Sequence, residues 1–208
     1  LQADGVGVAI VDTLQDADLM CIGRAVAELK LVTAGSGVAI GLPQNWLATG
    51  ALSRAAASSV LPGVTGAAAA ISGSCSQATN AQVAAFLQAG GQALAIDPLA
   101  LAAGRASVAE ALAWAEPLLG QAPVLIYATA PADAVKKTQT ALGVAVAGQL
   151  VEEALSTIAA GLVERGVRRL IVAGGETSGA VVQMLGIREL AIGPPIDPGV
   201  PWTVATTA

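Results

Sequence analysis

The sequence predicts a three-layer α/β sandwich built on a mostly parallel sheet. Short apolar stretches alternate with longer stretches whose apolar residues recur at helical spacing, and turns rich in glycine and serine separate them. Alanine and valine supply much of the apolar content, which suits buried parallel strands and closely packed helices. In such sheets ligands bind outside the carboxyl ends of the strands, where we expect the Gly/Ser-rich turns to lie.

The first 42 residues predict a strand–helix–strand unit. Residues 5–11 form a continuous apolar stretch that predicts a buried parallel strand. Apolar residues at helical spacing follow, with Asp16 and Asp18 near the start of the expected helix. Residues 31–33 predict a second strand, and residues 34–37 predict a Gly-Ser turn.

Residues 43–66 are punctuated by proline and glycine. We interpret them as a connection between two domains, with one helix over residues 52–60. The alternative is a helical excursion within a single domain.

From residue 67 onward, strands and helices alternate. We expect strands at residues 67–72, 93–97, 123–127, 170–173, 190–192 and 202–205, and helices at residues 79–88, 108–119 and 147–164, with another between its Thr177 or Ser178 cap and Gly186. Residues 128–143 read as a loop. Residues 193–201 contain four prolines and predict irregular structure.

Composition excludes several classes of function. The 208 residues are 54% hydrophobic with a mean hydropathy of +0.68, but Gly, Pro, Gln or Asp interrupts every apolar run before the roughly 18 residues that span a bilayer. We therefore expect no membrane partner. A net charge of −5 argues against a nucleic-acid partner, and two cysteines favour a reducing, cytoplasmic location. The first residue is Leu1 rather than Met, so we expect a piece of a longer chain, with a processed terminus as the alternative.

The absence of histidine narrows the chemistry. Without it, the chain holds no Ser-His-Asp or Cys-His machinery and no zinc site built on histidine. The Walker phosphate-loop pattern is absent as well. No metal site built by this chain alone, and no catalytic residue, is predicted.

One motif, residues 170–182, reads as a strand, a turn and the first turn of a helix. Gly174 and Gly175 allow positive φ and close approach of a ligand, and Thr177 or Ser178 is expected to cap the helix. The free N–H groups at such a helix start can bind an anion, most often phosphate. The alternative is a capped strand-to-helix turn without a ligand.

A second motif, residues 72–76, places three serines and Cys75 at another strand-to-helix junction. Its backbone N–H groups, with Ser74 or Ser76, can hold phosphate oxygens or ribose hydroxyls. Cys75 can be read as a nucleophile at a helix N-terminus or as a small buried residue.

Other residues near these turns remain ambiguous. Glu176 can hold Mg²⁺ through water, or can simply favour the first turn of a helix. Asp97 and Asp197 are acidic contacts or turn formers. Tyr127 and Trp202 can stack on a base or fill the core.

Three segments together resemble the four-carbon acid sugar kinase family, which includes 3-oxo-tetronate kinases and was formerly labelled Hrp-dependent type III effector. Residues 72–82 are similar to the opening of that family's nucleotide-binding C-terminal domain. Residues 173–181 resemble its second signature, residues 192–201 its third, and residues 123–127 a comparable strand. The order and spacing of the segments also match.

The resemblance implies ATP-dependent phosphorylation of a four-carbon acid sugar, with Mg²⁺ accompanying the nucleotide. The match to the family's motifs supports Ser74 and Gly175 best as ATP contacts. The weaker candidates are Gly73, Ser76, Gly174, Glu176, Thr177 and Ser178.

The resemblance also implies a domain division. Residues 1–42 are the end of a substrate-binding domain, residues 43–66 the connection, and residues 67–208 a nucleotide-binding domain that is incomplete at its C-terminus. The family's acidic Asp-Asp-x-Thr-Gly-Ala-type opening is absent, as is its Gly-Asn-Phe-Gly-type segment. We therefore expect the chain alone to be inactive as a catalyst.

Two other classes stay open. A non-catalytic module that binds an anionic metabolite or nucleotide fits the same turns. A dinucleotide-dependent enzyme fits less well, because no G-x-G-x-x-G opens a helix after a strand. A homo-oligomer is compatible with the sequence.

Overall fold

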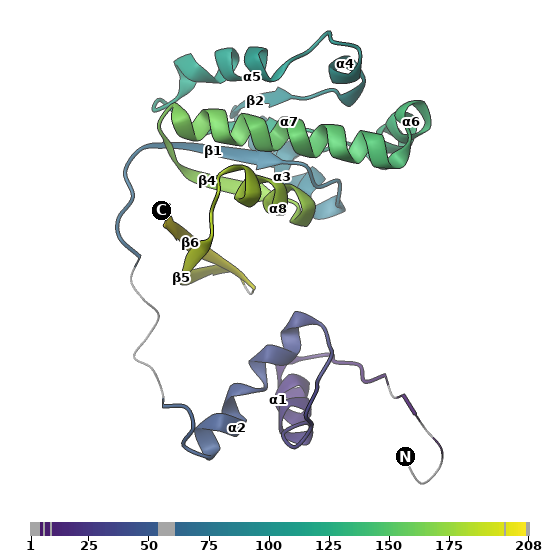
Figure 1. Cartoon of the computed structure of the whole chain (residues 1–208), viewed down its shortest axis with the longest axis vertical. Coiled ribbons are helices and arrows are strands. Elements are labelled where there is room, and N and C mark those ends of the chain that lie inside the picture. Colours follow the sequence, from purple (N-terminus) through teal and green to yellow (C-terminus); the bar gives the residue numbers. More distant parts are fainter. Residues whose placement is uncertain (1–4, 6, 9, 54–60, 198, 207–208) are drawn as a thin grey trace. The chain divides into compact units, whose positions relative to one another are not determined.

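The structure is a computed structural model that describes residues 5, 7–8, 10–53, 61–197 and 199–206. The chain divides into two compact units (Figure 1). One contains Leu1–Leu61 and Ile192–Val204, and the other contains Pro62–Ala191 and Ala205–Ala208. Each unit is described by itself.

The larger unit is built on a four-stranded parallel sheet with strand order β2-β3-β1-β4. Residues Ile71, Ile126 and Val172 lie side by side in register across its middle. The strands are β1 (Ala67–Ser72), β2 (Gln92–Ala95), β3 (Val124–Tyr127) and β4 (Val167–Ala173). The predicted parallel α/β class is confirmed.

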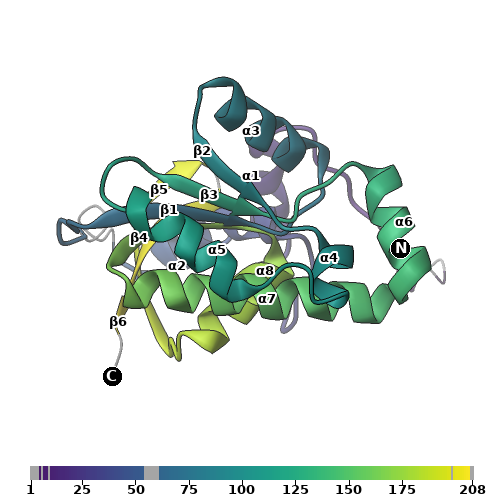
Figure 2. The same cartoon turned by 90° about the horizontal axis from the view of Figure 1, so that it is seen from above.

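Helices cover both faces of this sheet (Figure 2). α3 lies on one face, and α5 and α7 lie on the other, where α7 packs against β1, β4 and α5. The helices of this unit are α3 (Gln77–Gln88), α4 (Pro98–Ala102), α5 (Val108–Ala115), α6 (Ala132–Leu142), α7 (Val144–Glu164) and α8 (Gly175–Met184), with a 3₁₀ turn η3 (Glu116–Leu118).

The hydrophobic core lies between the sheet and α7. Ile71 and Ile126 from the strands and Leu155, Ile158 and Leu162 from α7 are fully buried there. By length and composition α7 would pass for a membrane-spanning helix, although Gln149, Glu152 and Glu153 interrupt its apolar sequence. Its residues Leu155, Ile158, Ala159 and Leu162 belong to this core, which accounts for part of the apolarity of the helix.

Two helices of this unit were missed. α6 occupies residues 132–142, which we expected to be loop, and α4 follows Asp97. Residues 132–142 contain no glycine or proline, and Pro131 and Gly143 bound them. The many polar side chains mark an exposed helix rather than a loop, because only a narrow stripe of a surface helix needs to be apolar.

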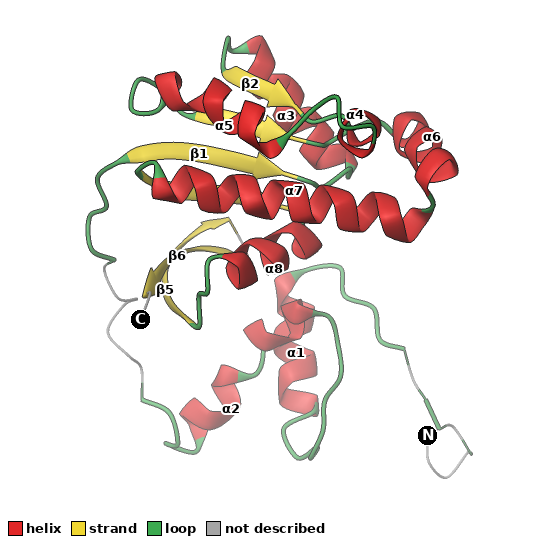
Figure 3. Cartoon of the chain, turned by 45° about the horizontal axis from the view of Figure 1, so that its top comes forward, coloured by secondary structure: helices red, strands yellow, loops and turns green. Residues whose placement is uncertain are grey.

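The smaller unit contains α1 (Asp16–Ala25), a 3₁₀ turn η2 (Ser36–Ile40) and α2 (Pro43–Ala48) (Figure 3). Gly23 and Gly41 touch so closely that a Cβ on either would collide with the neighbouring backbone. The Asn45 side-chain amide donates to the carbonyl of Gly23 at 2.8 Å, which satisfies a carbonyl in the last turn of α1. The predicted helix near Asp16 and Asp18 is confirmed.

The two strands expected in this unit are wrong for the described residues. Val8 and Ile10 are 84% and 92% exposed and Leu31 is 82% exposed, and the structure places none of them in a strand. An apolar run becomes a buried strand only beside a pairing neighbour. Most of the helix expected at 52–60 lies outside the described residues; Leu52 and Ser53 are not helical.

The proline-rich segment also differs from expectation. Residues expected to be irregular form much of β5 (Glu189–Asp197), which pairs with β6 (Val200–Thr206) in a two-stranded sheet. Both strands are edges, so prolines can occupy positions whose N–H would face away from the partner. The strand expected at residues 202–205 is confirmed within β6.

Candidate functional site

The turns that follow β1 and β4 are joined by backbone hydrogen bonds. The amides of Gly73 and Ser74 both donate to the carbonyl oxygen of Ala173, at 3.0 and 3.1 Å. Two of the three sequence motifs therefore meet at the carboxyl end of the sheet, as ligand-binding turns of parallel sheets do. The third motif lies in the β5–β6 segment.

Glycine is required where these turns touch. A Cβ on Gly73 would collide with Thr177 Oγ1 and would lie 3.2 Å from Leu155 Cδ1. Gly174 has a φ of 125° and a ψ of 130°, a region that side chains rarely adopt. The glycines thus allow two turns and a helix to approach at one point.

α8 starts earlier than the sequence suggested. Gly174 is its N-cap and Gly175 its first residue, without a side-chain cap, so the capping role expected of Thr177 or Ser178 is wrong. Instead the Ser178 amide donates to the carbonyl of Gly174 at 2.8 Å, and Thr177 is buried. The positive φ of Gly174 turns the chain into the helix, and Gly175 does not share it.

Three hydroxyls form a cluster at the start of α3. Ser76 caps the helix by accepting from the Thr79 amide at 3.1 Å. The Thr79 hydroxyl donates to Ser74 Oγ at 3.1 Å and lies 2.9 Å from Ser76 Oγ. The Ser76 hydroxyl is thus used in capping α3. The Ser74 hydroxyl, in contrast, donates to no atom of the described residues.

Asn80 ties this turn to the loop after β3. Its amide donates to the carbonyls of Cys75, Ser76 and Ala130, at 3.2, 3.0 and 3.4 Å. The sequence reading missed this residue. The available signal was an amide side chain one helical turn after a serine-rich cap, where it can bond the preceding carbonyls.

A cavity of about 350 Å³ opens at the carboxyl end of the sheet. This volume is at the lower end of the range for small-molecule sites. Residues of the loops after β1, β2 and β3 and of α6, α7 and α8 line it, namely Gly73, Cys75, 95–98, 127–130, Ala134, Val135, Thr138, Gln139, Ala147, Gly148, Val151, Glu152, Glu176 and Thr177.

Carboxylates supply the formal charge of this lining. Asp97, Glu152 and Glu176 line the cavity, and none of the lining residues in the described part of the chain is lysine or arginine. Asp97 also caps α4, accepting from the Leu99 amide at 2.9 Å. Among the described residues no group of three or more Cys, Asp or Glu could hold a metal ion.

The predicted contacts divide between the cavity and its surroundings. Gly73, Glu176 and Thr177 line the cavity. The others lie outside the lining: Ser74 and Ser76 in the hydroxyl cluster, and Gly174, Gly175 and Ser178 at the start of α8. Their contact with a nucleotide stays a prediction.

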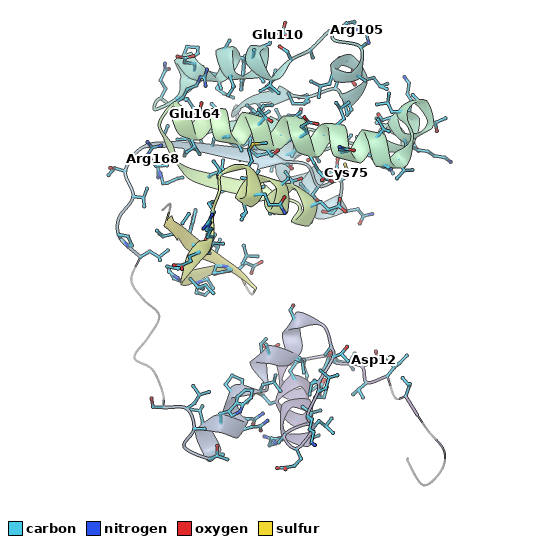
Figure 4. All side chains as sticks on the ribbon, in the orientation of Figure 1. Asp12, Cys75, Arg105, Glu110, Glu164 and Arg168 are labelled. Carbon is cyan, nitrogen blue, oxygen red and sulfur yellow. The ribbon has the colours of Figure 1, made fainter. Side chains whose placement is uncertain are left out.

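The structure also locates the residues whose roles the sequence left open. Tyr127 lines the cavity, and Trp202 and Asp197 lie in the β5–β6 segment. Cys75 is exposed, so its reading as a buried residue is wrong. Figure 4 shows Cys75 at the same end of the sheet as α6, whereas Arg168 lies at the opposite end.

The walls formed by α6 and α7 were not foreseen. These helices lie far along the chain from the turns and contribute Val135, Gln139, Gly148 and Glu152 to the lining. One of the two, α6, was expected to be a loop. Sequence motifs mark the glycine turns but carry no signal for helices that only cover the site.

Comparison with known proteins agrees with this geometry. The family model for the nucleotide-binding C-terminal domain matches residues 69–208. A 3-oxo-tetronate kinase from Cupriavidus necator is 53% identical over 209 aligned positions, covering 100% of this chain and 48% of that protein. The chain thus spans about half the length of the curated relatives it matches.

Solved structures agree too. The Haemophilus influenzae protein HI1011 superposes with a TM-score of 0.69 at 34% identity, covering 98% of this chain and 48% of that one. A Bordetella bronchiseptica domain of unknown function, a domain-swapped dimer with bound citrate, gives 0.50 at 25% identity, covering 99% and 47%. The chain belongs to the four-carbon acid sugar kinase family and carries its nucleotide-binding C-terminal domain.

Proposed function

We propose that this chain is the ATP-binding portion of a kinase that phosphorylates a four-carbon acid sugar of the 3-oxo-tetronate or threonate type. The observation that carries the proposal is the meeting of two family motifs, through Gly73 and Ala173, beside a cavity at the carboxyl end of a parallel sheet. The name of the Cupriavidus relative supports the substrate class.

In this proposal Ser74 and Gly175 make the principal ATP contacts. The Ser74 hydroxyl has its hydrogen free for a phosphate oxygen, and Gly175 presents its N–H at the start of α8, where the helix dipole favours an anion. Gly73, Ser76, Gly174, Glu176, Thr177 and Ser178 surround these two residues and complete the proposed set.

Mg²⁺ fits the proposed site as an ion carried by the nucleotide. Glu176 offers oxygen ligands of the kind Mg²⁺ prefers, and a single carboxylate together with substrate phosphates and waters is a usual arrangement. The ion would offset phosphate charge near a lining that contains carboxylates. The protein's part is to place Glu176 at the edge of the cavity.

The acceptor comes from outside the nucleotide-binding domain. We assign residues 1–42 to the end of the substrate-binding domain, residues 43–66 to the connection and residues 67–208 to the nucleotide-binding domain. A hydroxyl of the acid sugar would attack the γ-phosphate in line, and positioning and charge stabilisation would supply the catalysis. The chain alone is inactive in this proposal, and no general base is assigned to it.

The cellular setting follows from the same class of enzyme. We place the protein in the cytoplasm, with neither nucleic acid nor membrane as a partner. A homo-oligomer accords with the domain-swapped dimer of the Bordetella structure. The alternative function is a non-catalytic module that would bind a nucleotide or an anionic metabolite at the same turns.

Two measurements on the full-length protein test the proposal. ATP titration by calorimetry, with and without Mg²⁺, should show saturable binding, and four-carbon acids should be phosphorylated. Absence of ATP binding would refute the kinase assignment, and ATP binding without transfer to any acid would favour the non-catalytic module. Loss of ATP binding in Ser74→Leu, with unchanged thermal stability, would support the assigned contact.

A further inference from the structure

Two threonine side chains are buried at the cavity. Thr177 is 4% exposed and Thr129 is 8% exposed, and both belong to the lining. The lining carboxylates of Glu176 and Asp97, by contrast, belong to exposed residues. In ligand pockets a few fixed polar groups among apolar walls set the orientation of the ligand.

The Thr177 hydroxyl has no hydrogen-bond partner among the described residues. It lies against the backbone of Gly73, because a Cβ on that glycine would collide with its oxygen. In the described part of the chain, no fully enclosed side-chain oxygen or nitrogen lacks a partner, so this oxygen keeps accessible surface, and Thr177 belongs to the cavity lining. A polar group in this position is stabilised when a ligand or a water supplies the missing hydrogen bond.

The Thr129 hydroxyl is oriented by Ser72. The two side-chain oxygens lie 2.6 Å apart, and Ser72 is itself 3% exposed. The carbonyl oxygen of Ser72 lies 3.5 Å from Thr129 Oγ1, at the limit of a hydrogen bond. Ser72 therefore fixes the position of this hydroxyl and leaves it hydrogen-bonding capacity toward the cavity.

The charge of the lining decides which part of a nucleotide fits. Asp97, Glu152 and Glu176 carry carboxylates, and no lining cation opposes them. A triphosphate placed beside Asp97 and Glu152 would be repelled, whereas at Glu176 the proposed Mg²⁺ would offset the charge. A neutral base and ribose would not be repelled, and Ile96, Tyr127 and Val151 offer them apolar contact.

We propose that this cavity holds the nucleoside portion of the nucleotide, that the hydroxyls of Thr177 and Thr129 are its two fixed polar contacts, and that the phosphates lie outside the lining. The proposal rests on the nucleotide-binding function proposed above. It makes Ser72 a positioning residue, since it acts on the ligand only through Thr129.

Calorimetry on the full-length protein tests this assignment with three ligands: MgATP, adenosine and inorganic tripolyphosphate. Adenosine should bind saturably but more weakly than MgATP, because it lacks the phosphates that Ser74 and Gly175 would contact, and tripolyphosphate should not displace it. Thr177→Ala and Thr129→Ala should each weaken adenosine binding about tenfold, as loss of a buried hydrogen bond predicts.

Serine variants provide the matched controls. Thr177→Ser and Thr129→Ser lose the same methyl group as the alanine variants but keep the hydroxyl, so they should retain adenosine affinity. Ser72→Ala should weaken adenosine binding less than Thr129→Ala, and the two changes together should cost no more than Thr129→Ala alone. Thr140→Ala, on the exposed part of α6, should have no effect.

Several outcomes would overturn the assignment. The protein could bind MgATP but not adenosine, or tripolyphosphate could displace adenosine. The serine and alanine variants could bind adenosine with equal affinity. The alanine variants could also bind MgATP more weakly while their affinity for adenosine stays unchanged. If the unsubstituted protein binds neither MgATP nor adenosine, the proposed nucleotide function itself fails.

Discussion

Gly73 and Ala173 join the two turns of the candidate site, because the amide of Gly73 donates to the carbonyl oxygen of Ala173 at 3.0 Å. The Ser74 amide shares that carbonyl at 3.1 Å. One carbonyl at the end of β4 thus holds the start of the turn that follows β1. The two segments lie about a hundred residues apart in the sequence and act as one structural element.

Gly73→Ala should disturb this junction. The new methyl group would collide with Thr177 Oγ1 and crowd Leu155, so we expect a loss of about 1–3 kcal/mol in the free energy of unfolding. ATP affinity should fall as well, because Thr177 must move. Urea unfolding and calorimetry of the full-length protein measure the two effects.

Gly179→Ala is the matched control for that change. Gly179 lies in α8, has open space around its Cβ position and lacks a positive φ. Alanine there should raise stability slightly, since it favours the helix over glycine. If Gly73→Ala proved as harmless as Gly179→Ala, the close packing of the two turns would be contradicted.

Gly174→Ala should be costly for a different reason. Its φ of 125° and ψ of 130° lie in a region open almost only to glycine, and its Cβ would come within 3.2 Å of the Ser74 amide nitrogen. Strain of this kind costs about 1–3 kcal/mol. We expect a lower melting temperature and weaker ATP binding in the full-length protein.

Gly186→Asn offers the comparison for Gly174. Gly186 follows α8 with a φ of 63°, in the left-handed region that asparagine tolerates, and has open space around it. This variant should change stability by less than the Gly174 variant. If both variants lost similar stability, any positive-φ glycine after a strand or helix would be equally costly to replace. The position of Gly174 at the junction of the two turns would then have no special role.

The sequence predicted the sheet well because parallel strands leave a local signal. β1 was predicted with its observed bounds, and β3 and β4 were found from their apolar runs. The glycine turns were also predictable, since only a few residue types suit positive φ and helix starts. Family motifs then linked turns that no local pattern could have brought together.

The missed features depend on contacts distant in sequence. The apolar residues near Ile10 remain unpaired among the described residues, which composition alone could not reveal. The prolines of β5 are tolerated because the strand lies at an edge, a property of the sheet and not of the segment. The cavity walls of α6 and α7 were missed because covering a site requires no motif.

Asn80→Ala should loosen the turn after β1 without removing a predicted ligand contact. The amide now holds the carbonyls of Cys75, Ser76 and Ala130, so its loss should cost about 0.5–1.5 kcal/mol in stability. ATP affinity should fall further than this change in stability suggests, because both joined loops flank the cavity. Gln82→Ala, on the exposed side of the same helix, should leave both quantities unchanged.

Two glycines of α7 should respond in opposite ways to alanine. Gly148 lines the cavity, and a Cβ there would lie 4.0 Å from Glu152 Oε1, with no closer side chain among the described residues, so Gly148→Ala should stabilise the helix by up to about 1 kcal/mol. Gly161 faces α5, where a Cβ would lie 2.5 Å from Leu112 Cδ1, so Gly161→Ala should destabilise the protein by about 1–3 kcal/mol.

A larger side chain at the first of these positions separates stability from ligand binding. Gly148→Phe would place an aromatic ring in the 350 Å³ cavity and should abolish nucleotide binding while the protein still unfolds cooperatively. Calorimetry with MgATP and urea unfolding of the same preparation measure both. A Gly148→Phe protein that bound MgATP with unchanged affinity would show that the nucleotide does not use this cavity, because the ring would occupy the space the nucleoside needs.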